Sequence, residues 1–264
     1  MVRIQSPSSI NTYNQCPRKY YYHYIEKLET KPSIHLIRGN IMHSVLEDFF
    51  KVDSKNLSKD HYDFELKTIA HELLKKWWNE KKEELDSLEL GNAKLEFYLR
   101  ESRNMLDNWL NLFLNKLKKE GGLVGFKRLT PETEVYLESN EHMVRGYVDA
   151  IHVIDGKINI IDYKTSKSDE LRDEYKLQLA IYALMYHEKH GKMPHKAGVD
   201  FLRHGEKFID VDQGLLDLAK TETALIQKNT QSNEKDDYKL SPSRLCNWCD
   251  FYSLCFEKDK VYKG

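Results

Sequence analysis

Two aspartates and a lysine in the middle of the chain have the residue types and spacing of a metal-dependent hydrolytic site. Asp162 and Lys164 follow an apolar run, and Asp149 lies on the segment before it. Side chains at i and i+2 of a strand point to the same face, so Asp162 and Lys164 project together. The Asp155-Gly156 dipeptide predicts a hairpin turn that brings Asp149 within reach of Asp162. Two converging carboxylates beside a lysine suit a divalent cation and the orientation of water or phosphate.

A surface ion pair is the alternative interpretation, and it is the commoner one for an isolated Asp-x-Lys tripeptide. Here Asp162 directly follows Ile160 and Ile161, which a strand should bury, so its charge needs a partner. His43 is a second candidate, either as a metal ligand or as a histidine satisfied within its helix. Glu47, one helical turn later, is either its partner or a solvent-facing charge.

The elements that must position these residues alternate between strand and helix in the C-terminal half. Period-two and helical spacing predict strands over 134–137, 143–154, 157–164, 197–202 and 207–211, and helices over 171–190 and 215–227. The N-terminal half is predicted to be helical. Ser6 and Pro7 are typical of a helix start, and 39–50 forms a helix that carries His43. The charged, proline-free region 58–120 predicts two long amphipathic helices.

Composition excludes several classes of protein. The 264 residues are 40% hydrophobic, which is enough to fill a sizeable core. Lys plus Arg number 41 and Asp plus Glu 42, which argues against a histone-like binder of nucleic acid. The sequence has no membrane-length apolar run, no signal-peptide pattern and no phosphate-binding G-x4-G-K-[ST] loop. We therefore expect a cytoplasmic protein without a membrane partner and without an ATP motor of that type.

The four cysteines are unevenly distributed. Cys16 stands alone near the start, whereas Cys246, Cys249 and Cys255 form a C-x2-C-x5-C cluster near the end. Three interpretations are open: free buried thiols, a tetrahedral zinc site, and a [4Fe–4S] cluster. If all four cysteines meet, the two ends of the chain must be adjacent.

In their order along the chain, these motifs resemble the RecB-like branch of the PD-(D/E)xK nuclease superfamily. The sequence is most similar to its small iron–sulfur members, such as the CRISPR-associated adaptation exonucleases and the nuclease domain of AddB. The matching motifs are Ser8-Ser9-Ile10-x2-Tyr13-x2-Cys16-Pro17-Arg18-x-Tyr20, Gly39-x3-His43-x3-Glu47, Glu134, Gly146-x2-Asp149, Asp162-Tyr163-Lys164, Gln178-x3-Tyr182 and Cys246-x2-Cys249-x5-Cys255. Only the region 55–120, a variable insertion in the family, carries no motif.

The resemblance implies an α/β fold with a restriction-endonuclease-like core, in which helices flank a mixed central sheet. One nuclease domain would span 1–264, with a helical insertion at 55–120. The segments 1–24 and 240–258 would together form the cluster-binding region and join the two ends of the chain. The resemblance also favours an iron–sulfur cluster over Zn²⁺ at the cysteines, as a structural staple.

The resemblance also implies a role for each site residue. His43, Asp149, Asp162 and the main-chain carbonyl of Tyr163 would hold Mg²⁺ or Mn²⁺, and the imidazole tilts the preference toward Mn²⁺. Lys164 would orient or deprotonate the attacking water or stabilise the charge on the phosphate. The remaining residues have weaker assignments: Glu134 would hold a second metal or a metal-bound water, and Gln178 and Tyr182 would position the DNA backbone or Lys164, unless Tyr182 only packs in the core.

The expected function is a metal-dependent DNA exonuclease that prefers single-stranded ends, with 5′ to 3′ polarity favoured. The alternatives are a DNA-binding or assembly subunit with a vestigial site, or an endonuclease within a larger complex. Expected partners are DNA with free ends and proteins of a repair or CRISPR adaptation complex. The first 40 residues carry six Lys or Arg and two Glu, and with Tyr20, Tyr21, Tyr22 and Tyr24 they either track single-stranded DNA or pack on the core.

Overall fold

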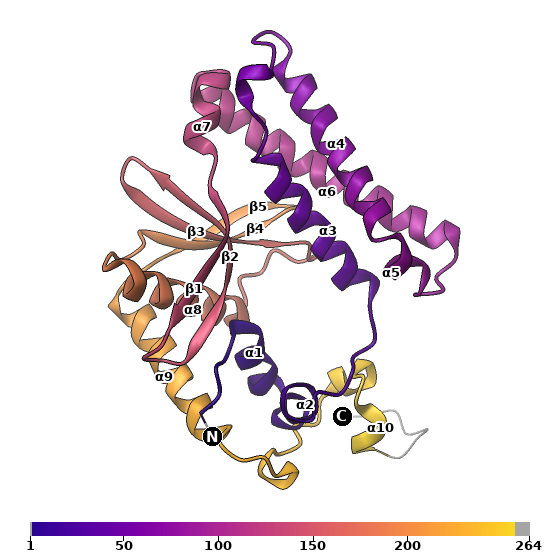
Figure 1. Cartoon of the computed structure of the whole chain (residues 1–264), viewed down its shortest axis with the longest axis vertical. Coiled ribbons are helices and arrows are strands. Elements are labelled where there is room, and N and C mark those ends of the chain that lie inside the picture. Colours follow the sequence, from indigo (N-terminus) through magenta and orange to yellow (C-terminus); the bar gives the residue numbers. More distant parts are fainter. Residues whose placement is uncertain (1, 257–264) are drawn as a thin grey trace.

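A five-stranded mixed sheet forms the centre of the protein in the computed structural model, which describes residues 2–256. The strands lie in chain order: β1 (Glu132–Ser139), β2 (Val144–Ile154), β3 (Lys157–Lys164), β4 (Lys196–Phe201) and β5 (Gly205–Asp210). All neighbours pair antiparallel except β3 and β4, which are parallel and are connected through the helix α8 (Asp173–His190). Helices cover both faces of the sheet (Figure 1), so the predicted α/β architecture is confirmed and is consistent with a restriction-endonuclease-like core.

β3 has the predicted bounds and is apolar on both faces because each face is covered by helices. Ile158 and Ile160 pack in the core under α8, and Ile161 and Tyr163 pack in the opposite core. The turn before β3 also forms as predicted. Asp155 and Gly156 have φ of 51° and 75°, the left-handed values that a two-residue hairpin turn requires.

The second face of the sheet is covered by α3 (Ile34–Phe49), α4 (Tyr62–Glu80) and α6 (Asn92–Lys119) (Figure 1). α3 begins five residues before the predicted start, because the Ser33 side chain caps the backbone N–H of Leu36 and Gly39 lies inside the helix. The two long helices predicted within 58–120 are present, with the short α5 (Lys82–Asp86) between them. The short helix η2 (Ser54–Asn56) connects α3 to α4, and η3 (Gly122–Gly125) and α7 (Phe126–Leu129) connect α6 to β1.

The two ends of the described chain lie together below the sheet (Figure 1). The first segment contains α1 (Pro7–Gln15), α2 (Pro17–Tyr20) and the π-helical turn η1 (Tyr21–Ile25). Ser6 caps α1 with Pro7 in its first turn, as predicted. The second segment contains α9 (Gln213–Asn229), η4 (Lys235–Asp237), η5 (Arg244–Trp248) and α10 (Tyr252–Cys255). Of the region 240–258 expected to contact the first helices, residues 257 and 258 lie outside the described residues.

Two arginines of the N-terminal segment, Arg3 and Arg18, help to hold the fold together. The Arg3 guanidinium donates to the carbonyls of Thr230 (2.8 Å) and Ser232 (3.0 Å). Arg18 donates to the carbonyl of Tyr238 (2.7 Å). These two side chains join the two ends of the chain. Fewer cations are therefore available to bind DNA than the count of Lys and Arg in the first 40 residues suggests.

The tyrosines that follow Cys16 pack in the core rather than presenting free faces to bases. Tyr20 is 2% exposed, and its ring stacks on Tyr238 with centroids 6.1 Å apart. Tyr21 and Tyr22 are also buried. Of the two interpretations of this stretch, the structure therefore favours core packing.

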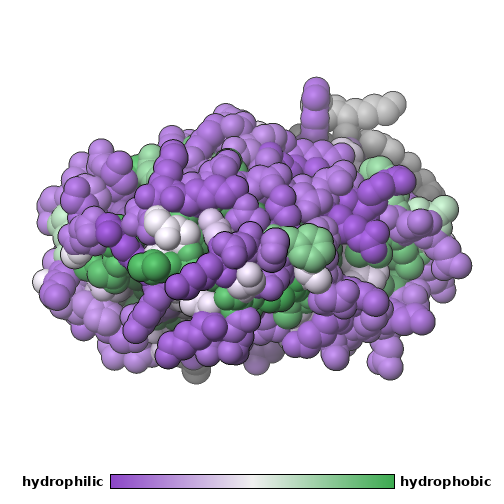
Figure 2. Space-filling model, turned by 90° about the horizontal axis from the view of Figure 1, so that it is seen from above, coloured by the Kyte–Doolittle hydropathy of each residue, from purple (hydrophilic) through white to green (hydrophobic). Residues whose placement is uncertain are grey.

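The surface is mostly hydrophilic, with hydrophobic side chains exposed in narrow strips (Figure 2). Residues 2–256 contain no helix that is both long and apolar enough to span a bilayer.

Asp200 on β4 is a buried acid that the sequence analysis did not single out. Trp109 Nε1 donates to its Oδ2 (3.1 Å), while its Oδ1 has no hydrogen-bond partner. Burial, and then the nearby charge of Glu206, raise the pKa of Asp200 from 3.8 to about 7. The folded protein therefore holds a proton on this carboxyl over a pH range in which the unfolded chain has lost it.

We predict that Asp200→Asn stabilises the protein at alkaline pH and not at acidic pH. Because the folded pKa is raised, the stability linked to this carboxyl is present below about pH 4 and is lost as pH rises toward 7. The amide carries no such penalty, so the variant should gain up to about 4 kcal/mol in free energy of unfolding above pH 7. Urea unfolding at several pH values from 4 to 8 measures this, and a difference that does not change with pH would contradict it.

Candidate active site

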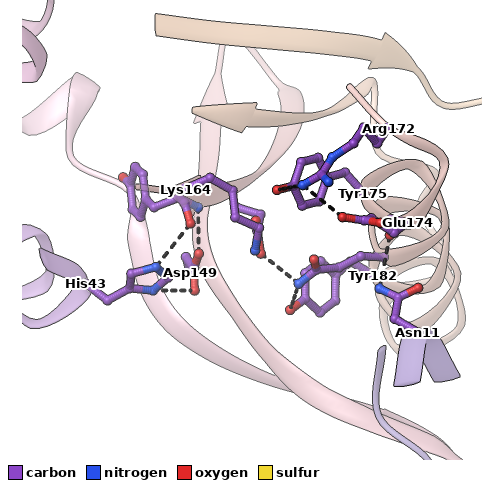
Figure 3. Close-up of polar contacts among 11 residues, drawn as sticks. Asn11, His43, Asp149, Lys164, Arg172, Glu174, Tyr175 and Tyr182 are labelled. Carbon is purple, nitrogen blue, oxygen red and sulfur yellow. Dashed lines mark hydrogen bonds and ion pairs between the residues drawn. The ribbon is translucent and has the colours of Figure 1, made fainter. Parts of the chain in front are cut away.

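His43 on α3 lies beside Asp149 on β2 (Figure 3), and both contact the main chain of Tyr163 on β3. His43 Nδ1 lies 3.2 Å from Asp149 Oδ1, and His43 Nε2 donates to the Tyr163 carbonyl (3.1 Å). The Tyr163 N–H donates to Asp149 Oδ2 (2.6 Å). The hairpin therefore delivers Asp149 to the main chain of the Asp-Tyr-Lys motif, as its turn residues predict.

Glu134 joins this group from β1. The pairs Thr133–Ala150 and Val135–Val148 on either side put Glu134 opposite Asp149. The ligand atoms of His43, Glu134 and Asp149 lie within 4.8 Å of one another. Glu134 also has a φ of 51°, a strained value for a side-chain-bearing residue, and such strain concentrates at functional sites. The hairpin register was the signal that could have placed Glu134 beside Asp149 from sequence.

Asp162 lies beside this group and has a different set of partners. Its Oδ1 accepts from Gln178 Nε2 (2.8 Å), and its Oδ2 pairs with Lys164 Nζ (2.5 Å). The side chain is almost fully buried, and burial raises its pKa to about 6 against the opposing charge of Lys164, while Asp149 raises it further. A buried carboxyl with a raised pKa readily binds a proton or pairs with another cation.

His43 and Lys164 respond to the same negative charge. For both, burial lowers the pKa, but the neighbouring carboxylates outweigh burial and the net pKa is raised. Asp149 dominates at His43 through its hydrogen bond, and Asp162 dominates at Lys164 through its charge. The carboxylates therefore favour the positively charged form of both bases.

Gln178 and Tyr182 lie one turn apart on α8 and extend the network from Asp162. Gln178 Nε2 donates to the Tyr182 hydroxyl (2.9 Å) as well as to Asp162. The Tyr182 ring is only 5% exposed and belongs to the core under the sheet. The ring of Tyr182 therefore packs in the core, while its hydroxyl accepts a hydrogen bond within the network of Asp162.

Tyr175 and Arg172 are functional candidates that the sequence analysis missed. Arg172 Nη2 donates to the Tyr175 hydroxyl (2.7 Å), and the Lys164 ammonium lies 5.6 Å from the Tyr175 ring centroid (Figure 3). Tyr175 lies three residues before Gln178 on α8, and this helical spacing was the available signal. A cavity of about 820 Å³ runs from Lys164 past Tyr175 to the polar side chains of α1, among them Asn11.

An imidazole and carboxylates with a nearby main-chain carbonyl are a suitable donor set for Mn²⁺ or Mg²⁺. The grouping of His43, Glu134 and Asp149 passes this test of fit, and Asp162 and the Tyr163 carbonyl border it. Glu47, the other candidate from the histidine motif, pairs with Lys51 (2.7 Å) at the surface of α3.

All four cysteines line one cavity of about 160 Å³ between α2 and the C-terminal segment. They are free thiols of intermediate burial, and burial raises the pKa of Cys249 and Cys255. A closed zinc tetrahedron needs sulfurs about 3.8 Å apart, from Zn–S bonds of about 2.3 Å. Within residues 2–256 no three of the sulfurs lie within 4.8 Å of one another, so that compact arrangement is not preformed. The four thiols therefore line one cavity without forming that compact arrangement.

Comparison with known families agrees with this geometry. A family model described as the PD-(D/E)XK nuclease superfamily matches residues 5–256. The chain belongs to this superfamily. The match spans nearly the whole chain, including the residues of the candidate site, and it makes the protein a nuclease without distinguishing the RecB-like branch.

Two phage proteins and one solved structure are similar to this nuclease. The Gene 69 protein of Mycobacterium phage D29 is 26% identical over 77% of this chain and 76% of its own length. The Gene 69 protein of Mycobacterium phage L5 is 23% identical over 79% of each. A crystal structure from Eubacterium rectale, of a protein assigned as an exonuclease, has a TM-score of 0.56 at 13% identity, covering 98% of this chain and 91% of that one. That likeness supports the fold, and none of these names refers to iron–sulfur clusters, DNA repair or CRISPR adaptation.

In this nuclease we predict that Asp149→Asn and Glu134→Gln each weaken Mn²⁺ binding by about tenfold or more, because each removes a charged oxygen ligand. Isothermal titration of the metal-free protein with Mn²⁺ measures the affinity. Glu188→Gln is the matched control, since Glu141, His142 and Glu188 form a second histidine–carboxylate group at the surface. Equal losses in the control and the site variants would contradict the assignment.

Proposed function

We propose that the protein is a divalent-metal-dependent deoxyribonuclease of the RecB-like branch, acting as an exonuclease on single-stranded ends with 5′ to 3′ polarity favoured. The observation that carries the proposal is the junction at β3. Tyr163 contacts Asp149 and His43 through its main chain, and its neighbours Asp162 and Lys164 form an ion pair beside them. A metal-binding group and a positioned lysine are the two parts that phosphodiester hydrolysis requires.

His43, Asp149 and Glu134 would hold the cation, with Asp162 and the Tyr163 carbonyl at its border. A bound Mn²⁺ or Mg²⁺ would supply Lewis acidity, making water a better nucleophile and offsetting charge on the phosphate. The Tyr163 N–H keeps one oxygen of Asp149 fixed, so that the carboxylate has a defined orientation. The Lys164 ammonium offsets the charge of Asp162 when this carboxyl is ionised, and the raised pKa of Asp162 also allows its protonated form.

Lys164 is proposed to act on the substrate directly. Its side chain is 24% exposed and lines the large cavity, so its ammonium can donate to a phosphate oxygen or orient the attacking water. Asp162 holds one side of the ammonium, and the Tyr175 ring lies on another. Gln178 in turn fixes Asp162, which gives Gln178 and Tyr182 a positioning role.

The cavity beside Lys164 supports a single-stranded substrate. It is lined by uncharged polar side chains of α1, namely Asn11, Thr12, Asn14 and Gln15, together with Tyr175 on α8. Such side chains contact sugar and phosphate without requiring a regular duplex, and an aromatic ring offers a stacking surface. Several acids also line this cavity, so we expect a weakly charged path rather than a basic groove.

We further propose that Cys16, Cys246, Cys249 and Cys255 hold a [4Fe–4S] cluster that staples 1–24 to 240–258, with Zn²⁺ as the alternative. Support comes from the shared cavity and from the one-plus-three spacing of the ligands. A cluster separates its cysteine sulfurs more than one zinc ion does, because each thiolate binds a different iron. Within the single domain, 55–120 remains the proposed insertion.

The central test is cleavage of end-labelled DNA with Mn²⁺ or Mg²⁺. We predict that Asp162→Asn and Lys164→Met each lower the rate by at least about a hundredfold, and that Glu188→Gln does not. Linear single strands should be degraded faster than duplexes, and circular single strands should survive. Cleavage of circles would show an endonuclease. DNA binding without cleavage by the unaltered protein would favour an assembly subunit with a vestigial site, which could act in a repair or CRISPR adaptation complex.

The cysteine site makes a separate prediction. Protein purified without oxygen should be brown, with broad visible absorbance that Cys249→Ala reduces strongly. Bound zinc in a colourless sample would favour the alternative, and Ser253→Ala is a control on the same segment. A metal-free, colourless protein with full activity would contradict both metal assignments.

A further inference from the structure

A second large cavity lies on the other face of the sheet, between α6 and strands β2 to β5. Its volume is about 710 Å³. α6 lies along this face (Figure 1), held there by Trp109, by Asn108, which donates to the Leu202 carbonyl (3.0 Å), and by the Lys116–Glu206 ion pair (2.5 Å). Asp162 and Lys164 belong to the opposite face of β3, so this cavity is separate from the candidate active site.

The walls of this cavity are aromatic. Trp109 and Phe113 stack on each other with centroids 5.5 Å apart, and Phe50 packs at right angles to both. Phe208 of β5 is 36% exposed and lies over Gly198, where a Cβ would come within 2.5 Å of its ring. The missing side chain at Gly198 lets the Phe208 ring lie close to the sheet with one face open. The cavity thus has surfaces for stacking a flat ring.

Two buried acceptors in the cavity lack donors. Asp200 is 5% exposed and its Oδ1 has no hydrogen-bond partner, while Asn159 Oδ1 is also buried and unpaired. The strand register pairs Tyr163 with Asp200 and Asn159 with Lys196, so the two acceptors are about 13 Å apart along the strands. Unpaired buried acceptors are costly. A ligand that donates N–H and O–H groups would satisfy both, and its donors would favour the ionised form of Asp200 over the protonated one.

The rim of the cavity carries two lysines and two glutamates, Glu120 and Glu206. Lys116 and Lys119 lie one turn apart near the end of α6 and both line the cavity. The charge of Lys116 lowers the pKa of both His152 and Asp200, so it acts on both polar ends of the cavity. Burial, with this charge, lowers the pKa of His152 to about 4, which leaves its imidazole neutral near pH 7. An anionic group would therefore contact Lys119 and compete with Glu206 for Lys116.

We propose that this cavity binds a nucleoside monophosphate. The base would stack against Phe208 and the aromatic wall and donate an N–H to Asp200 Oδ1. The sugar would reach toward Asn159 and His152, and the phosphate would bind Lys116 and Lys119. Asp200 Oδ1 and Asn159 Oδ1 are too far apart for one base to reach both, whereas a base joined to a sugar is longer and comes closer to spanning them. Guanine is the preferred base, because it offers two adjacent N–H donors to one carboxylate.

The cavity has a direct connection to the candidate active site. The Tyr163 side chain lines the cavity, while its main chain contacts His43 and Asp149. A bound nucleotide would therefore touch the residue that orders the proposed metal group. Nucleoside monophosphates are also the class of product that an exonuclease releases, so a bound product could regulate the active site through Tyr163. This regulation rests on the proposed function, whereas the binding itself does not.

Isothermal titration of the metal-free protein with dGMP tests the binding. We expect saturable binding that is about tenfold tighter than that of dTMP and about tenfold weaker in Phe208→Ala. Asp200→Asn should also lose about tenfold, because Trp109 fixes the amide oxygen and leaves the NH₂ facing the ligand donors. That variant is predicted to be more stable at alkaline pH, so its loss would not reflect misfolding.

Two controls separate this site from others. Phe64→Ala removes another exposed ring, 73% exposed on α4 and outside the cavity, and should bind dGMP normally. Asp149→Asn should also bind normally, even if cleavage is lost. The proposal is overturned if no monophosphate binds, or if Asp149→Asn abolishes binding while Asp200→Asn and Phe208→Ala do not. Because binding is measured without metal or cleavage, a failure of the proposed nuclease mechanism gives a different pattern.

Discussion

The neutralisation of buried carboxylates is the constraint on which the rest of this structure depends. Asp162 is fully enclosed at the end of an apolar strand, and Asp149 lies beside it. Negative charge in such a place is tolerated only with positive charge or hydrogen bonds close by. Lys164, His43 and Gln178 provide these from three different elements. A divalent cation would supply the same compensation, so the arrangement that stabilises the metal-free fold also prepares it for metal.

The covering layers follow from this central strand. β3 is apolar on both faces, so it requires helices above and below it. α8 covers one face and carries Gln178 and Tyr182, while α3 and the helices of 62–119 cover the other and bring His43. The ends of the chain then close below the sheet through Arg3 and Arg18, whose donors satisfy carbonyls near the C-terminus. The basic and aromatic character of the N-terminal segment mainly serves this closure.

Alternation along β3 connects the two cavities of the protein. Lys164 lines one cavity, and the neighbouring Tyr163 lines the other. The backbone of Tyr163 lies in the plane of the sheet between the two faces. Its N–H donates to Asp149, and its carbonyl accepts from His43. A rigid strand in the middle of a sheet is a short physical route between two sites. The superfamily assignment explains the first cavity, whereas the second has no counterpart among the motifs.

The sequence by itself determined the main helices and strands and the hairpin turn, and it predicted most of the candidate site residues that the structure brings together. Strand alternation and the Asp155-Gly156 turn depend on local backbone geometry, which a sequence records directly. Only the tertiary structure decided which groups pair: Glu134 with the His43 group, Lys164 with Asp162, and Tyr175 beneath Lys164. It also decided that the tyrosines after Cys16 are packed inside and that Asp200 is buried against α6. Burial and long-range partners depend on how layers stack, and no local pattern encodes that stacking.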